Sequence, residues 1–127
     1  MNRYFMEVMD AHTAIEQWLG EGAGEQQALL GRFSQGFSMV TLGGQLLDFS
    51  ELSAFFGRQR GAKPGLAIQI DCLSLLAEWE GGAVVTYRER QQQPGTEATT
   101  RWSSVVFALE EEQPRWRHLH ETLQPLG

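Results

Sequence analysis

The sequence has one cysteine, few basic residues and no long apolar run. A single cysteine, Cys72, excludes an intrachain disulfide, and its position in a predicted strand among apolar residues favours a buried, inert thiol. No segment approaches the roughly 20 apolar residues of a membrane span. Ten Lys and Arg residues oppose sixteen Asp and Glu, which gives a net charge of −6, and basic clusters such as Arg58–Lys63 are short. These absences argue against a membrane or duplex nucleic acid as a partner.

Several catalytic and targeting motifs are also missing. There is no Gly-x-Ser-x-Gly nucleophile turn, no phosphate-binding loop and no dinucleotide fingerprint, and we expect no cofactor. The first ten residues contain Glu7 and Asp10 and lack the apolar core of a signal peptide. The only asparagine, Asn2, lies outside a glycosylation sequon. We therefore expect a cytoplasmic protein.

The residues that are present predict one domain over 1–127, because 42% of them are hydrophobic and 20% are charged. Apolar residues at helical spacing predict helices over 4–19 and 25–31. A third helix is expected from Ser50, which is a good N-cap residue, to just before Gly61, and Asp48 is expected to help cap it. Strands are predicted over 33–42, 45–49, 66–80, 83–92, 99–110 and 115–123. This order indicates an α+β fold in which helices pack across one face of a curved sheet.

Two of the three histidines lie two residues apart in the last predicted strand. Side chains alternate between the two faces of a strand, so Trp116, His118, His120 and Thr122 are expected to share one face. That face would present an aromatic ring, two imidazoles and a hydroxyl, which could line a pocket for a small polar or acidic molecule. A His-x-His pair could also chelate a metal with Glu89, Asp71 or Glu78, but no spacing requires this and we expect no metal site.

The order of elements and the closing motif resemble the NTF2-like superfamily, in particular its SnoaL-like and DUF4440-type members. The most specific piece is His118-Leu119-His120-Glu121-Thr122, which looks like the family's closing His-x-His-x-Ser/Thr strand. Weaker support comes from residues 37–43, 83–88 and 100–107, and the resemblance covers nearly the whole chain. It implies a cystatin-like cone, with three N-terminal helices packed on a strongly curved, mostly antiparallel sheet. It also implies a homodimer that pairs through the sheet.

The resemblance makes His120 the first candidate for a pocket residue and for an acid or base, since its imidazole titrates near neutral pH. The alternative is a histidine held between sheet and helices by a backbone carbonyl. His118 would lie nearer the rim. An inward Arg101 would attract a carboxylate, enolate or phosphate, although a solvated pair with Glu89 or Glu121 is an equal alternative. The expected site is completed by three aromatic ligand-binding residues, Tyr87, Trp102 and Trp116. Tyr87 and Trp102 could instead pack at the dimer interface, which favours aromatic residues.

Other residues are expected to be structural or exposed. Trp18, Phe55 and Phe56 are most simply core residues that could touch the apolar end of the cavity. Asp10, near His12 on the first helix, could reach the cone, but an exposed pair of these two residues is the safer expectation.

Three functions compete at this stage because one fold carries many activities. The first is a domain that binds a small organic ligand, anionic or carbonyl-bearing, in its cone. The second is a small-molecule cyclase, isomerase or dehydratase that uses His120 as acid or base. The third is a structural dimerisation module whose cavity is filled by its own side chains.

Overall fold

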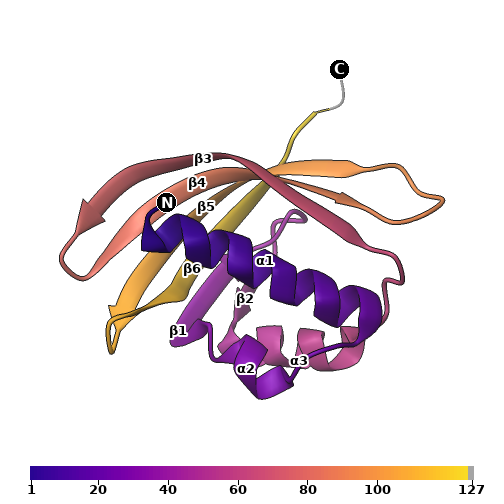
Figure 1. Cartoon of the computed structure of the whole chain (residues 1–127), viewed down its shortest axis with the longest axis horizontal. Helices are drawn as coiled ribbons and strands as arrows, with labels where there is room; N and C mark the ends of the chain where they lie inside the picture. Colours follow the sequence, from indigo (N-terminus) through magenta and orange to yellow (C-terminus); the bar gives the residue numbers. More distant parts are fainter. Residues whose placement is uncertain (126–127) are drawn as a thin grey trace.

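The computed structural model describes residues 1–125, and Figure 1 shows a curved sheet arching over helices on one side. Every predicted helix and strand is present, with boundaries within two residues of those expected. The elements, in chain order, are α1 (Arg3–Glu21), α2 (Gln26–Leu30), β1 (Phe33–Val40), β2 (Leu46–Asp48), α3 (Phe49–Gln59), β3 (Ala67–Trp79), β4 (Gly82–Gln92), β5 (Thr99–Glu110) and β6 (Gln113–Leu123). Within residues 1–125, no helix is long and apolar enough to cross a membrane.

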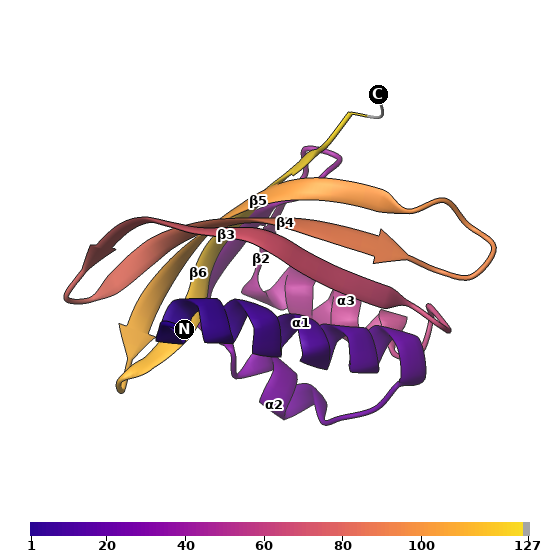
Figure 2. The same cartoon turned by 45° about the horizontal axis from the view of Figure 1, so that its top comes forward.

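The six strands form one sheet in the order β2-β1-β6-β5-β4-β3. All neighbouring pairs are antiparallel except β1 and β6, which run parallel in the middle of the sheet. The helices cover one side only, here called the inner face, and the opposite side is the outer face (Figure 2). The predicted α+β cone with helices packed on a mostly antiparallel sheet is therefore confirmed.

Helix α1 lies along the inner face because its apolar residues recur every three or four positions. Asn2 caps its start by accepting from the Phe5 N–H at 2.8 Å, and Gly22, at φ 66°, takes the left-handed conformation that ends it. The Trp18 Nε1–H donates to the Phe56 carbonyl at 2.8 Å and fixes α1 against α3.

The N-cap of helix α3 lies two residues before the predicted position. Asp48, not Ser50, is its N-cap: the Asp48 carboxylate accepts from the Glu51 N–H at 2.9 Å, and the Glu51 carboxylate accepts from the Asp48 N–H. The Ser50 prediction is wrong because this reciprocal capping box satisfies two helix-end donors at once. The expected capping role of Asp48 is confirmed.

The core is built around Trp116 on the inner face of β6. Its ring packs 5.0 Å from Phe107 and 6.0 Å from Phe33, measured between ring centroids. Its Nε1–H donates to the Glu7 carboxylate at 3.0 Å, so a polar edge of the indole is satisfied within the core. Trp116 is only 2% exposed, and it ties β6 to β1, β5 and α1.

Strand β6 contains a bulge at Arg117, and this changes which side chains face inward. Phe107 pairs with Trp116, but the next residue back along β5, Val106, pairs with His118, so Arg117 has no partner on β5. The Arg117 guanidinium donates to the Gly36 carbonyl on β1 instead. An extra residue shifts the alternation by one position, so Trp116 and Leu119 both point inward.

Strand β3 departs from its prediction at Cys72. This residue has φ 56° at a register shift against β4, and its side chain is exposed. The expectation of a buried thiol is therefore wrong, because the irregularity turns the residue away from the core.

Candidate functional site

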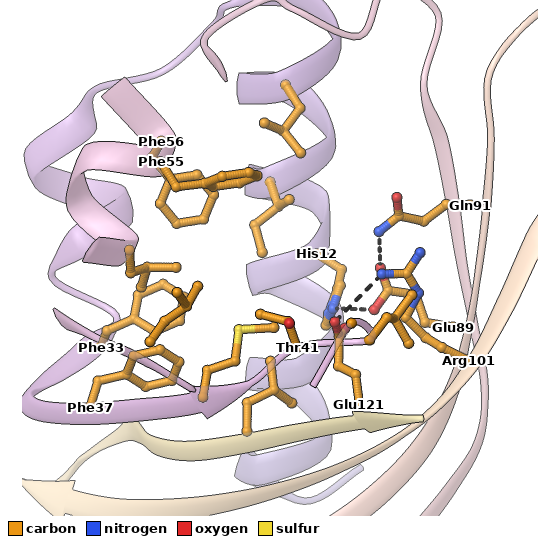
Figure 3. Close-up of a pocket in the computed structure, with 18 of the residues that line it drawn as sticks. His12, Phe33, Phe37, Thr41, Phe55, Phe56, Glu89, Gln91, Arg101 and Glu121 are labelled. Atoms are coloured by element: carbon orange, nitrogen blue, oxygen red, sulfur yellow. Dashed lines mark hydrogen bonds and ion pairs between the residues drawn. The ribbon is translucent and has the colours of Figure 1, made fainter. Parts of the chain in front are cut away.

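A pocket of about 310 Å³ lies between the inner face of the sheet and the helices. Figure 3 shows its two kinds of wall: aromatic rings from β1 and α3 on one side, and polar side chains from α1, β4, β5 and β6 on the other. The apolar wall consists of Ile15, Leu19, Phe33, Phe37, Met39, Leu42, Leu47, Leu52, Phe55, Phe56 and Leu119. Of the three residues expected to touch the cavity's apolar end, Phe55 and Phe56 line the pocket and Trp18 does not.

The polar wall follows from strand register. Glu89 on β4 pairs directly with Arg101 on β5, and both point inward. Ser103, two residues along β5, pairs with Glu121 on β6, so Glu121 lies diagonally across from Arg101 on the same face. His12 enters from α1, one turn after Val8. Four titratable or charged groups from four elements therefore meet at one end of an apolar pocket.

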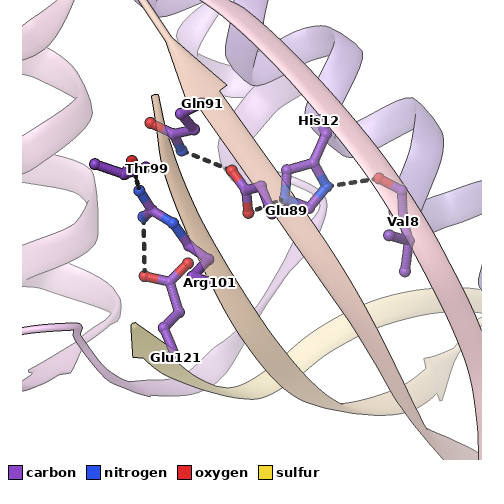
Figure 4. Close-up of polar contacts among 7 residues, drawn as sticks. All are labelled: Val8, His12, Glu89, Gln91, Thr99, Arg101 and Glu121. Atoms are coloured by element: carbon purple, nitrogen blue, oxygen red, sulfur yellow. Dashed lines mark hydrogen bonds and ion pairs between the residues drawn. The ribbon is translucent and has the colours of Figure 1, made fainter. Parts of the chain in front are cut away.

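His12 and Glu89 form a buried ion pair with an Nε2–Oε1 distance of 3.1 Å, and the two side chains are 7% and 3% exposed. The other ring nitrogen, Nδ1, lies 2.7 Å from the Val8 carbonyl, which can only accept. A carboxylate at Nε2 also needs a donor, so both ring nitrogens carry hydrogen and the ring is an imidazolium. Glu89 accepts on its second oxygen from the Gln91 amide at 2.6 Å (Figure 4).

Burial disfavours charge on His12 and on Glu89, but the contact between them favours the charged form of each by a larger amount. Burial lowers the pKa of His12, but the Glu89 hydrogen bond and charge and the Val8 carbonyl together raise it above its usual value. Burial likewise raises the pKa of the Glu89 carboxyl, but His12, Gln91 and the positive charge of Arg101 hold it below its usual range. Both ring nitrogens and both carboxylate oxygens are engaged, so this pair is a fixed electrostatic element and not a free acid or base.

Arg101 lies at the pocket wall with part of its donor set unused. Its side chain is 13% exposed; Nη2 donates to the Thr99 hydroxyl at 3.2 Å, and Nη1 lies 3.5 Å from Glu121 Oε1. Its buried Nε–H has no hydrogen-bond partner among residues 1–125. An unpaired buried donor is costly, and a guanidinium offers a planar fork that matches a carboxylate or phosphate. This arrangement favours an anionic group in the pocket.

Glu121 is the least constrained carboxyl of the site. Its side chain is 9% exposed, and its contact with Arg101 is an ion pair at 3.5 Å. Burial raises the pKa of the Glu121 carboxyl, the charge of Arg101 opposes this, and the nearby Glu89 carboxylate adds to the rise. Glu121 therefore accepts a proton more readily than an ordinary glutamate.

Among residues 1–125, no group of three or more His, Cys, Asp and Glu side chains is placed to hold a metal ion. His12 and Glu89 already satisfy each other, as described above.

Of the residues predicted from the sequence, Arg101 lies in the pocket. His118 and His120 do not: the bulge at Arg117 places them on the outer face, where His120 is exposed and the His118 Nδ1 lies 2.7 Å from the Ser38 hydroxyl. The premise that the imidazoles face the cavity is therefore wrong, and a role for His120 as acid or base has no support in this pocket.

The three predicted aromatic residues take two different positions. Trp102 is on the outer face and 44% exposed, so it is outside the pocket. Tyr87 and Trp116 are inward but buried in the core behind the pocket lining. They support the wall and are not part of its surface.

Sequence reasoning missed the His12–Glu89 pair and the position of Glu121. His12 was expected to be exposed beside Asp10, but it is 6% exposed. Its spacing from Val8 and Ile15, four and three residues away, places it on the buried face of α1 and was the signal available. Arg101 does pair with Glu121, as one alternative held, but within the protein and not in solvent.

No family model and no curated protein sequence matches the chain, but solved structures do. An NTF2-like protein of unknown function from Pseudomonas aeruginosa is 39% identical, with 98% of this chain and 100% of that chain covered and a TM-score of 0.93. An NTF2-like protein from Cytophaga hutchinsonii is 12% identical, with 98% and 100% covered and a TM-score of 0.74. The CaMKII hub homology domain of Chlamydomonas reinhardtii is 15% identical, with 97% of each chain covered and a TM-score of 0.77. The last two show a shared fold only.

Proposed function

The chain belongs to the NTF2-like family, and we propose that it binds a small organic anion, a carboxylate with an apolar body, in the pocket under its sheet. The observation that carries this proposal is Arg101, a guanidinium on the polar wall of a cavity whose opposite wall is apolar, with a buried Nε–H that no residue of 1–125 satisfies. A ligand carboxylate would supply the missing acceptor.

The shape of the pocket defines the rest of the ligand. Phe33, Phe37, Phe55 and Phe56 form an aromatic wall opposite Arg101, so the ligand's other end is apolar. A volume of about 310 Å³ is at the lower limit of the usual range for ligand sites. These features fit a short alkyl or aryl carboxylate better than a sugar or nucleotide.

The fixed charges of the site favour an anion over a cation. The Glu89 carboxylate is already occupied by His12 and Gln91, so it offers little to an incoming ammonium group. Arg101, by contrast, has an Nε–H donor without a hydrogen-bond partner among residues 1–125. Lys63 also lines the pocket, from the segment after α3, but it is partly exposed and solvent screens its charge.

The expected homodimer remains a prediction. The outer face of the sheet supports a dimer, because Trp102 is 44% exposed there and no helix covers this face (Figure 2). Aromatic residues are enriched in protein interfaces. A self-associating chain would leave the pocket, which lies on the inner face, free to bind its ligand.

The test is titration calorimetry with hexanoate and benzoate, and with hexanamide as the uncharged counterpart. The wild type is expected to bind the carboxylates and not the amide, and Arg101→Gln is expected to lose about ten- to a hundredfold in affinity, the value of a charge-assisted hydrogen bond. The matched control is Arg88→Gln, which removes an arginine from the outer face of β4 and is expected to leave affinity unchanged.

Two results would contradict the proposal. Equal binding by Arg101→Gln and wild type would mean that the guanidinium does not hold the ligand. Absence of binding and of any rise in melting temperature for every carboxylate would favour the structural module, since a ligand at 100 times its Kd stabilises a protein by about 2.7 kcal/mol.

A further inference from the structure

We propose that anion binding in this pocket is coupled to uptake of a proton by Glu121, whose protonated carboxyl joins Arg101 in holding the ligand. This inference rests on the proposed function and adds to it a mechanism by which pH controls occupancy. It follows from the charges that surround the pocket and from which of them are already satisfied.

The pocket's buried charges are balanced before a ligand enters. His12 offsets Glu89 at 3.1 Å, and Arg101 offsets Glu121 at 3.5 Å. Lys63, on the segment after α3, is the remaining charged group of the lining and is partly exposed, so solvent screens it. A carboxylate placed beside Arg101 would therefore add one uncompensated negative charge among buried side chains, which is strongly unfavourable. Uptake of one proton restores the balance.

Only one of the two carboxyls in the site is free to take that proton. Both Glu89 oxygens accept hydrogen bonds, from His12 and Gln91, and protonation would break the ion pair with the imidazolium. Within residues 1–125, Glu121 has a single ion pair, at 3.5 Å, which is longer than an ordinary charge-assisted hydrogen bond. Its carboxyl already has a raised pKa before a ligand arrives.

Protonation also changes what Glu121 can do for the ligand. As a carboxylate it only accepts, and it would repel an anion and compete with it for Arg101. As a carboxylic acid it gains an O–H donor. Arg101 and Glu121 lie on adjacent strands of the inner face, so the ligand carboxylate would receive an N–H from one and an O–H from the other. The balance is simple: one anion and one proton enter together, and no bond to carbon changes.

The experiment measures proton uptake directly, with hexanesulfonate as the main probe. A sulfonate stays ionised at all relevant pH values, so any proton taken up on binding must go to the protein. Calorimetric titrations in buffers with different heats of ionisation give the number of protons per ligand. We expect this number to approach one in the wild type at pH values between the pKa of Glu121 in the free protein and its higher pKa in the complex. Affinity should then fall by up to about tenfold per pH unit, the limit for one linked proton.

Glu121→Gln identifies the group that takes the proton, because its amide keeps a donor that does not titrate. This variant is expected to bind hexanesulfonate with no proton uptake and with an affinity that no longer falls as pH rises. Glu110→Gln, at an exposed position at the end of β5, is the matched control and should behave as the wild type. A second readout needs no variant: infrared difference spectra of the wild type should gain a protonated carboxyl band when hexanesulfonate is added.

Each outcome separates this inference from the proposed function. Tight binding of hexanesulfonate and hexanoate with no proton uptake would overturn the coupling and leave the anion site intact. Proton uptake that persists in Glu121→Gln would overturn the assignment to this residue. If neither wild type nor Glu121→Gln binds any anion at any pH, the proposed function fails and the coupling fails with it.

Discussion

Neighbouring residues of β4 form two ion pairs on opposite faces of the sheet. Glu89 points inward to His12, in a pair whose side chains are 3% and 7% exposed. Arg88 points outward to Asp71, with Nη2 2.6 Å from Oδ2, but those side chains are 35% and 56% exposed. The outer pair has the better geometry, since its two nitrogens contact both carboxylate oxygens. Geometry and energetic importance therefore differ, because solvent screens one pair and not the other.

The two faces also differ in what their charges can do. On the outer face, the hydrogen bond from Arg88 lowers the pKa of the Asp71 carboxyl, and both groups stay charged in water. On the inner face, burial and the nearby Glu89 raise the pKa of the Glu121 carboxyl, so the charge of Glu121 depends on the groups around it. The inner face is thus where binding and protonation can be linked.

The sharpest test of the comparison replaces one tryptophan on each face. Trp116→Ala should lower the free energy of unfolding by about 3–5 kcal/mol, because the fully packed indole leaves a cavity and the Glu7 carboxylate keeps only its contact with Arg32. Trp102→Ala, at a side chain 44% exposed, should cost well under that. Urea denaturation measures both values. Similar losses at the two positions would mean that the outer face is covered by another chain in solution.

The buried and exposed ion pairs give the next largest difference. Glu89→Ala should cost about 3–5 kcal/mol because it leaves the His12 imidazolium buried without a counter-charge. Asp71→Ala, which breaks the exposed pair, should cost about 0–1 kcal/mol. Thermal and urea unfolding of both variants at neutral pH check this. A small loss for Glu89→Ala would show that His12 sheds its proton and stays buried as a neutral ring.

The fold could be predicted from the sequence because each element carries its own signal. Helical spacing in α1, the glycine pairs at the hairpins and the apolar runs of β3 to β5 are local patterns that tertiary packing reinforces. Of the site, the sequence predicted Arg101 on the polar wall and Phe55 and Phe56 on the apolar wall. In β6 the alternation rule failed at a single residue, the bulged Arg117, whose guanidinium donates to the Gly36 carbonyl of β1, a neighbouring strand that is far away in the sequence. Strict alternation cannot reveal such a contact. It therefore predicted that His118 and His120 face the pocket, whereas Leu119 and Glu121 do so.

The smallest effect concerns the pH dependence of stability at Glu121. Its pKa is higher in the folded protein than in the unfolded chain, so the folded state holds the proton more tightly. The stability that this provides is present below the unfolded pKa and is lost as pH rises through the folded value. Glu121→Gln carries no such proton. We expect the variant to gain stability relative to the wild type as pH rises from acidic to neutral, by less than either loss above.

Urea unfolding of both proteins across this pH range measures the difference. The exposed Glu110→Gln serves as the control and should show little such trend, because its carboxyl lies in solvent at the end of β5. If Glu121→Gln instead loses stability relative to the wild type as pH rises, the Arg101 ion pair outweighs the burial of the carboxylate. The Glu121 carboxylate would then be stabilised by Arg101, as the Asp71 carboxylate is by Arg88, and the two faces would not differ at this residue.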